Sequence, residues 1–286
     1  MAKVELLGNQ ASGYQLIVDG APFFIKGAGL EFGRLESLAM AGGNAFRTWR
    51  VTNGERDATD ILDEAQALGL KVCMGLDIAR ERHGFDYSDQ TAVDAQTEQM
   101  MQDVLRLKDH PALLMWGLGN ELNLRAKNDG VWDAVEALAL RIKAQDPDHP
   151  VTTMLAGIDA HTVEAIAKRA PSLDFLSFQI YGEIDHLPKI LDEAGYDGPY
   201  QITEWGPTGH WESPETVWGR PFEPSSTRKA NDILRRYEDI ILSDAKRCIG
   251  SYIFLWGQKQ ERTPTWYGMF LETGERTEAV EVMQQV

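Results

Sequence analysis

Residues 113–121 read LLMWGLGNE, and this stretch decides the fold of the chain. The apolar run 113–118 has the length and composition of a strand that is buried on both faces. Gly119 ends the run, and the polar pair Asn120 and Glu121 follows directly. Buried strands of this kind form parallel sheets in α/β proteins, where reactive groups stand at the carboxyl ends of the strands.

The same unit recurs along the chain, because short apolar runs alternate with segments of helical period. The predicted strands are residues 23–26, 45–49, 71–76, 113–118, 151–155, 175–180, 200–203 and 251–255. Ile61, Leu62 and Ala65 lie on one face of a helix, and Gly69 is a suitable stop signal for it. Eight such units in 286 residues favour an α/β fold, a single (β/α)8 TIM barrel that forms one catalytic domain over 1–286.

The N-terminal region predicts a short β-hairpin ahead of the first barrel strand. Residues 14–18 and 23–25 are strand-like, and Gly20 to Pro22 supplies the turn. We expect this hairpin to plug the bottom of the barrel. The rival architecture, an open doubly wound sheet, lacks its Gly-x-Gly-x-x-Gly signature, since Gly27-Ala28-Gly29 leads into LEF and not into a helix.

Composition excludes several classes of partner and cofactor. A net charge of -16 and a pI near 4.8 argue against nucleic acid and anionic membranes, and favour a neutral substrate. No metal-binding or phosphate-binding motif occurs, so no cofactor and no metal are predicted. Cys73 and Cys248 are expected to be free buried thiols.

No apolar run is long enough for a membrane span, and none at the start resembles a signal peptide. We therefore expect a soluble protein, which is secreted or periplasmic if a signal peptide has been removed and cytoplasmic otherwise. The sequence leaves the oligomeric state open.

Two carboxylates stand at predicted strand ends that would share one rim of the barrel. Glu121 follows the fourth strand, and Glu204 follows the seventh. Glycoside cleavage needs such a pair, because one group protonates the leaving oxygen while the other meets the positive charge that develops on the sugar ring. Glu31 and Asp77 also stand at strand ends, either as substrate ligands or as paired acids.

At this point the sequence resembles the clan A glycoside hydrolases, especially families 2 and 5. The fourth-strand segment, with His110-Pro111 before it, is similar to the clan's signature. So are residues 43–49 (GNAFRTW) for the second strand, 202–206 (ITEWG) for the seventh and 23–27 (FFIKG) for the entry into the first. The resemblance implies a retaining β-glycoside hydrolase that acts on a β-linked glucan or other oligo- or polysaccharide by double displacement.

The resemblance also implies roles for single residues. Glu121 becomes the general acid/base and Glu204 the nucleophile. Arg47 would pair with Glu204, Tyr181 would donate a hydrogen bond to Glu204, and Asn120 would bind the sugar 2-hydroxyl. Trp256 would form the floor of the subsite. Trp49 and Trp205 stand at strand ends, where they are either further substrate-binding aromatics or part of the packing of a lid. Gln179 departs from the pattern, because family 2 members often carry Asn there.

Two loops add candidates. The segment 206–224 is long and carries His210, Trp211, Trp218 and Arg220, and long loops in compact domains tend to be functional. The segment 257–267 is rich in polar and aromatic residues and is a candidate to contact sugar hydroxyls. His83, with Arg80 and Arg82 nearby, is expected to belong to a solvated loop face.

Two alternatives remain open from the sequence. A transglycosylase would use the same two glutamates and transfer the sugar to another sugar. A non-catalytic carbohydrate-binding barrel would lack a carboxylate or the arginine, and this chain has all of them.

Overall fold

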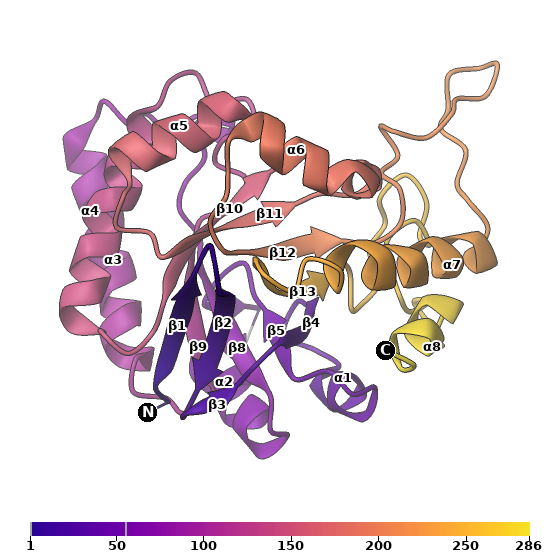
Figure 1. Cartoon of the computed structure of the whole chain (residues 1–286), viewed down its shortest axis with the longest axis horizontal. Helices are drawn as coiled ribbons and strands as arrows, with labels where there is room; N and C mark the ends of the chain where they lie inside the picture. Colours follow the sequence, from indigo (N-terminus) through magenta and orange to yellow (C-terminus); the bar gives the residue numbers. More distant parts are fainter. Residues whose placement is uncertain (1, 55) are drawn as a thin grey trace.

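The computed structural model describes residues 2–54 and 56–286, which form a closed barrel surrounded by helices (Figure 1). Within these residues, eight parallel strands pair in sequence order and the last pairs with the first. The strands are β4 (Ile25–Gly29), β5 (Ala45–Arg47), β8 (Lys71–Leu76), β9 (Leu113–Leu118), β10 (Val151–Ala156), β11 (Phe175–Gln179), β12 (Tyr200–Trp205) and β13 (Cys248–Ile253). The predicted TIM barrel is confirmed.

Helices between the strands pack on the outside of the barrel (Figure 1). They are α1 (Leu35–Met40), α2 (Ala58–Ala67), α3 (Gln90–Leu107), α4 (Gly130–Gln145), α5 (Ala160–Arg169), α6 (Leu187–Ala194), α7 (Ser226–Arg236) and α8 (Glu278–Met283). In α2, Ile61, Leu62 and Ala65 are buried as predicted, and Gly69 adopts a left-handed φ of 71° just after the helix.

Short strands and helical turns lie in the loops. A small ribbon joins β6 (Thr52–Asn53) and β7 (Arg56–Asp57), 3-10 turns η1 (Glu81–His83) and η2 (Gly182–His186) follow β8 and β11, and the π-helical turn η3 (Tyr237–Ile241) extends α7. The segment between β12 and α7 makes a long excursion away from the barrel (Figure 1).

The N-terminal hairpin is larger than predicted. An additional strand, β1 (Val4–Asn9), pairs antiparallel with β2 (Gly13–Val18), which in turn pairs with β3 (Ala21–Pro22). β1 has no clear pattern of buried positions in the sequence, because much of this strand is exposed. Val4, Leu16 and Val18 are buried in one cluster with Ile25 and Leu114 at the starts of β4 and β9, so the sheet plugs the bottom of the barrel as expected.

The ends of two strands differ from the prediction in ways that affect the site. β12 extends to Trp205, so Glu204 belongs to the strand itself. β13 ends at Ile253, because this residue makes the last pairs with β12 and β4, and residues 254 and 255 lie beyond the sheet. Cys73 and Cys248 are free and buried, as predicted. Among the described residues no helix combines the length and the apolar character needed to cross a membrane.

Candidate active site

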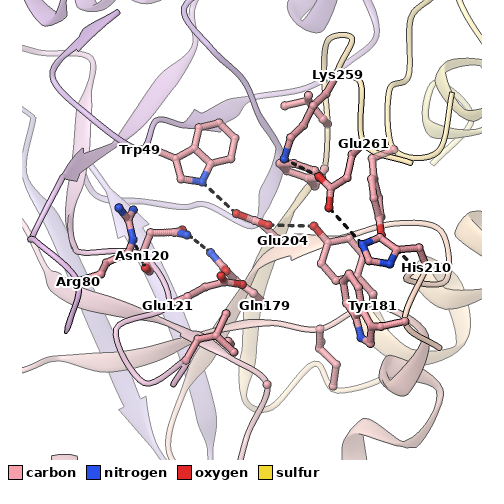
Figure 2. Close-up of a pocket in the computed structure, with 18 of the residues that line it drawn as sticks. Trp49, Arg80, Asn120, Glu121, Gln179, Tyr181, Glu204, His210, Lys259 and Glu261 are labelled. Atoms are coloured by element: carbon pink, nitrogen blue, oxygen red, sulfur yellow. Dashed lines mark hydrogen bonds and ion pairs between the residues drawn. The ribbon is translucent and has the colours of Figure 1, made fainter. Parts of the chain in front are cut away.

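A cavity of about 920 Å³ opens at the carboxyl ends of the barrel strands. Trp49, Asn120, Glu121, Tyr181 and Glu204 line it, although they come from strand ends far apart in the sequence (Figure 2). The barrel brings them together because all parallel strands end at one rim. The two glutamates predicted from the sequence therefore face the same cavity.

Glu204 is nearly buried, with 7% of its surface exposed, and hydrogen-bond donors hold both of its oxygens. Its Oε1 accepts from Trp49 Nε1 at 3.0 Å and lies 3.3 Å from Arg47 Nη1. Its Oε2 accepts from the hydroxyl of Tyr181 at 2.9 Å. Donors of this kind, one of them a buried guanidinium, bind the ionised form of a carboxylate.

Glu121 occupies an unusual backbone conformation directly after β9. Its φ is 54°, in the left-handed region, which costs an ordinary L-residue about 1 to 2 kcal/mol. Gly119, two positions earlier, has a φ of 72°, which glycine adopts without strain because it has no Cβ. The amide of Glu121 donates to Met154 O in β10 at 2.8 Å, which fixes this turn. Backbone strain that neighbouring structure maintains in this way clusters at functional sites.

The carboxyl of Glu121 lies in an environment that favours its protonated form. Burial and then the negative charge of Glu204 raise its pKa above the ordinary value of a glutamate. The positive charge of Arg82 acts in the opposite direction but does not cancel these effects. Two carboxyl groups in one cavity thus have different surroundings: Glu204 accepts hydrogen bonds on both oxygens, whereas the surroundings of Glu121 favour its protonated form.

Asn120 is oriented by three neighbours. Its side-chain Oδ1 accepts from Arg47 Nη2 at 2.7 Å and from Gln179 Nε2 at 2.6 Å, and its main-chain oxygen accepts from Arg80 Nε at 2.9 Å. Because the amide oxygen is occupied, the amide nitrogen of Asn120 is turned the other way as a donor. Gln179, which departs from the family pattern, therefore supports Asn120 in this chain.

His83 is exposed, as expected, but the neighbouring Arg80 and Arg82 are turned inward. Their side chains are 17% and 15% exposed, and they lie against the end of β9. Arg82 donates to the main-chain oxygen of Glu121 and lies 3.4 Å from its Oε2. A short loop after β8 carries both arginines, and the sequence offered no periodic signal that placed them inward.

Glu31 and Asp77 are paired acids on the cavity wall. Glu31 lies 3.6 Å from Arg50, and Asp77 lies 3.1 Å from Arg80. The cavity wall also contains Lys259 and Glu261 from the segment 257–267, as the sequence suggested for that loop.

Trp256 and Trp205 lie outside the cavity, contrary to the expectation for both. The ring of Trp256 is 2% exposed and packs against Phe270 at 5.3 Å. Trp205 is fully buried and stacks on Tyr237 at 5.8 Å, because neighbours along a strand point to opposite faces and Glu204 takes the inner one. Phe254 lines the cavity instead, with its ring 5.8 Å from that of Trp49.

The excursion 206–224 contributes to the cavity through its first part. Trp211 lines the cavity, is 60% exposed, and meets Tyr181 edge to face at 5.4 Å. The carboxylate of Glu212 ties this loop to β11 by accepting from the amide of Gly182 at 2.8 Å. Trp218, further out, is 73% exposed and does not belong to the cavity wall.

Comparison with known proteins identifies relatives of the barrel. Curated relatives include the β-glucuronidases of Chlorocebus aethiops and Homo sapiens, which are 25% and 24% identical over 182 residues. Each alignment covers 58% of this chain and 26% of the relative, so the chain spans about a quarter of the length of these proteins.

Solved structures show the same fold. The β-D-glucuronidase of Dictyoglomus thermophilum superposes with a TM-score of 0.73 at 18% identity, covering 100% of this chain and 53% of that one. A family 5 mannosidase from Rhizomucor miehei has a TM-score of 0.72 at 14% identity, covering 99% and 96%.

The sequence model of the glycosyl hydrolases family 2 TIM barrel domain matches residues 55–208. This match extends over more than half of the chain and includes both candidate glutamates. The chain therefore belongs to the TIM barrel domain family of the family 2 glycosyl hydrolases.

Proposed function

We propose that this chain is the catalytic barrel of a retaining β-glycoside hydrolase, with Glu204 as nucleophile, Glu121 as general acid/base and residues 1–286 as one catalytic domain. One observation carries the proposal. Glu121 and Glu204 share a cavity, but hydrogen-bond donors contact both oxygens of Glu204 while burial raises the pKa of Glu121. Membership of the glycosyl hydrolase family supports the same reaction class.

In the first step, a carboxylate oxygen of Glu204 attacks the anomeric carbon of a bound β-glycoside. The bond to the leaving oxygen breaks, and Glu121 gives that oxygen its proton. Sugar and Glu204 are then joined in an ester of inverted configuration. Trp49 and Tyr181 hold the attacking carboxylate in place, and Arg47 balances its charge before the attack.

In the second step, Glu121 acts as a base. It accepts a proton from a water molecule, which attacks the anomeric carbon and releases Glu204 as a carboxylate, so the original configuration is restored. Asn120 offers its amide nitrogen to the sugar 2-hydroxyl, because Arg47 and Gln179 occupy its oxygen. Such a hydrogen bond strengthens as the ring acquires positive charge.

The substrate class is a β-linked glucan or other β-linked oligosaccharide. Exposed aromatic faces at the cavity, above all Trp211, suit the C–H faces of sugar rings. Because several relatives are named as β-glucuronidases, uronides have to be compared with neutral glycosides as substrates.

A transglycosylase is the second candidate, and Trp211 is the observation that favours it. Its side chain is 60% exposed, lines the cavity and contacts Tyr181. A second sugar that bound on this ring as acceptor would displace water from the covalent intermediate. The two glutamates would keep their roles, with an acceptor hydroxyl in place of water.

The test is product analysis on β-glucans, β-mannans, β-galactans and 4-nitrophenyl β-glycosides that include the glucuronide. We expect cleavage that proton NMR shows to release the β-anomer first, and longer products would identify transfer. Glu204→Gln abolishes the reaction, whereas Glu238→Gln, which changes an exposed carboxylate of the outer helical turn η3, does not. Initial release of the α-anomer would contradict retention, and no reaction on any substrate would favour the binding-only barrel.

A further inference from the structure

The segment 257–267, which follows β13, places two opposite charges on the cavity wall. Lys259 and Glu261 both line the cavity that contains Glu204 (Figure 2). Lys259 Nζ lies 2.6 Å from Glu261 Oε2 and 5.5 Å from the centre of the Phe254 ring. The other oxygen of Glu261 lies 3.6 Å from His210 Nε2. The carboxylate is therefore held between a lysine and a histidine in the cavity wall.

His210 does not neutralise this carboxylate near pH 7. Burial, assisted by the neighbouring positive charge of Arg262, lowers the pKa of His210 below its ordinary value. The imidazole is then uncharged, and Lys259 is the cation that pairs with Glu261. Because the lysine and the carboxylate cancel, this part of the wall offers a sugar hydrogen-bond donors and acceptors without a free positive charge.

The remaining cations of the described cavity wall are also engaged, except one. Arg50 pairs with Glu31, and Arg80 pairs with Asp77 and bonds to Asn120. Arg125 has no carboxylate partner among the described residues, and it lies on the exposed loop after β9, a few residues beyond Glu121. Arg125 thus comes from the loop after β9, whereas Lys259 comes from the segment after β13.

Acidic residues outnumber basic ones in the lining of the same wall, although Arg47 and Arg82, which stand behind it, pair with Glu204 and Glu121. Its acidic residues are Glu31, Asp77, Glu121, Glu183, Glu204, Glu212 and Glu261, and its basic residues are Arg50, Arg80, Arg125 and Lys259. A sugar carboxylate that entered this cavity would need a cation of its own, because the lysine and most of the arginines there are already paired with carboxylates. A hydroxymethyl group meets no such penalty and has both donors and acceptors to bind.

We propose that Glu261, held by Lys259 and His210, is a specificity-determining residue that restricts the sugar bound at Glu204 to a neutral one and rejects uronic acids. The inference rests on the proposed function and names the charge class of its substrate. It distinguishes this chain from relatives that are named as β-glucuronidases. The reason is that Lys259, which would otherwise be available to bind a sugar carboxylate, is already paired with Glu261.

The experiment compares matched pairs of 4-nitrophenyl β-glycosides that differ only in the group on C5: glucoside and glucuronide, galactoside and galacturonide, mannoside and mannuronide. We expect wild type to favour the neutral member of the pair it accepts by at least about 100-fold in kcat/KM. Glu261→Gln frees Lys259 and lowers this ratio by at least about 10-fold, chiefly by improving the uronide.

Glu238→Gln is the control, since it makes the same change of charge on an exposed residue of the outer helical turn η3 and should leave the ratio unchanged. Preference for the uronide, or a ratio that Glu261→Gln does not change, would overturn the inference while the proposed hydrolase activity stands.

If no glycoside is turned over, the proposed function fails and charge selection is tested by binding alone. Thermal unfolding is then followed with glucono-1,5-lactam and with its C6-carboxylate analogue, glucaro-1,5-lactam. We expect stabilisation of wild type by the neutral lactam only, and added stabilisation of Glu261→Gln by the anionic one. Stabilisation of wild type by the anionic lactam, or by neither, would overturn the inference.

Discussion

The hydroxyl of Tyr181 donates to Oε2 of Glu204 over 2.9 Å, on the carboxylate oxygen that Trp49 and Arg47 leave free. Burial and the adjacent charge of Glu204 hold the pKa of Tyr181 well above its usual range. Tyr181 therefore remains a donor at any pH at which the protein works. The two oxygens of Glu204 are thus restrained by different donors.

The first prediction concerns this hydrogen bond. Tyr181→Phe should lower kcat by about 100-fold, because one preorganised donor is lost from the attacking carboxylate. The free energy of unfolding should change by only about 1 kcal/mol, as expected for one hydrogen bond. Steady-state kinetics and urea unfolding measure the two effects. Tyr267→Phe, which removes a cavity hydroxyl that accepts from the amide of His210 and touches neither glutamate, is the control and should leave kcat within about 3-fold.

The second prediction tests the nucleophile directly. Glu204→Ala should lower kcat by at least about 10⁴-fold, because no group remains to form the covalent intermediate. Azide should restore turnover of 4-nitrophenyl β-glycosides, since it fits the space of the missing carboxylate, attacks the anomeric carbon and expels 4-nitrophenolate. The product should be the α-glycosyl azide, which NMR identifies. A β-configured azide, or full activity without azide, would show that Glu204 is not the nucleophile.

The third prediction separates the acid/base from the nucleophile. Glu121→Ala should slow substrates with poor leaving groups by about 100-fold or more, because their oxygen needs a proton in the transition state. Substrates with a 2,4-dinitrophenolate leaving group need no proton, so the first step should be nearly unchanged and a burst of phenolate should precede slow hydrolysis. Stopped-flow absorbance measures the burst. Equal loss on both kinds of substrate would contradict the role of Glu121.

The residues that the sequence predicted well share one property: they follow apolar runs that end in polar pairs. Glu121 follows β9 and Glu204 is the last residue but one of β12, so the apolar runs place both at the carboxyl ends of strands. Arg47 was placed for the same reason, at the end of β5. Barrel geometry then brings the ends together without any further information from the loops.

Residues beyond the last strand pair were not predictable in this way. The run 251–255 suggested that Trp256 closes the strand, but pairing stops at Ile253 and the chain turns, so Phe254 enters the cavity and Trp256 enters the outer core. Arg82 was missed because its inward direction depends on the loop after β8 and on the oxygen of Glu121 that it reaches. Such contacts follow from tertiary packing and have no sequence period.

The fourth prediction uses Arg82 to test the protonation of Glu121. Arg82 lowers the pKa of Glu121, so Arg82→Gln should raise that pKa further. The first step needs protonated Glu121, and its rate falls as pH rises through this pKa. The alkaline limb of kcat/KM should therefore move to higher pH for a substrate with a poor leaving group.

The control for this shift is Arg50→Gln, which removes a rim cation paired with Glu31 and should leave the limb in place. A limb that moves to lower pH in Arg82→Gln would show that another group sets it.

The fifth prediction concerns Phe254 and Trp256, because Phe254 lines the cavity where the sequence predicts Trp256. Trp256→Phe should lower the free energy of unfolding by about 1 to 3 kcal/mol, because a ring that is 2% exposed loses contacts in the outer core. Its kcat/KM should stay within about 2-fold of wild type, since Trp256 does not border the cavity.

Phe254→Leu should have the opposite effects. Its KM should rise several-fold, because the ring beside Trp49 is lost from the cavity wall. Its free energy of unfolding should fall by less than about 1.5 kcal/mol, because leucine keeps much of the side-chain volume. Thermal unfolding and steady-state kinetics on one aryl glycoside distinguish the two variants. A larger rise in KM for Trp256→Phe than for Phe254→Leu would indicate that Trp256 and not Phe254 contacts the sugar, because loss of an aromatic face that a sugar packs against weakens substrate binding directly.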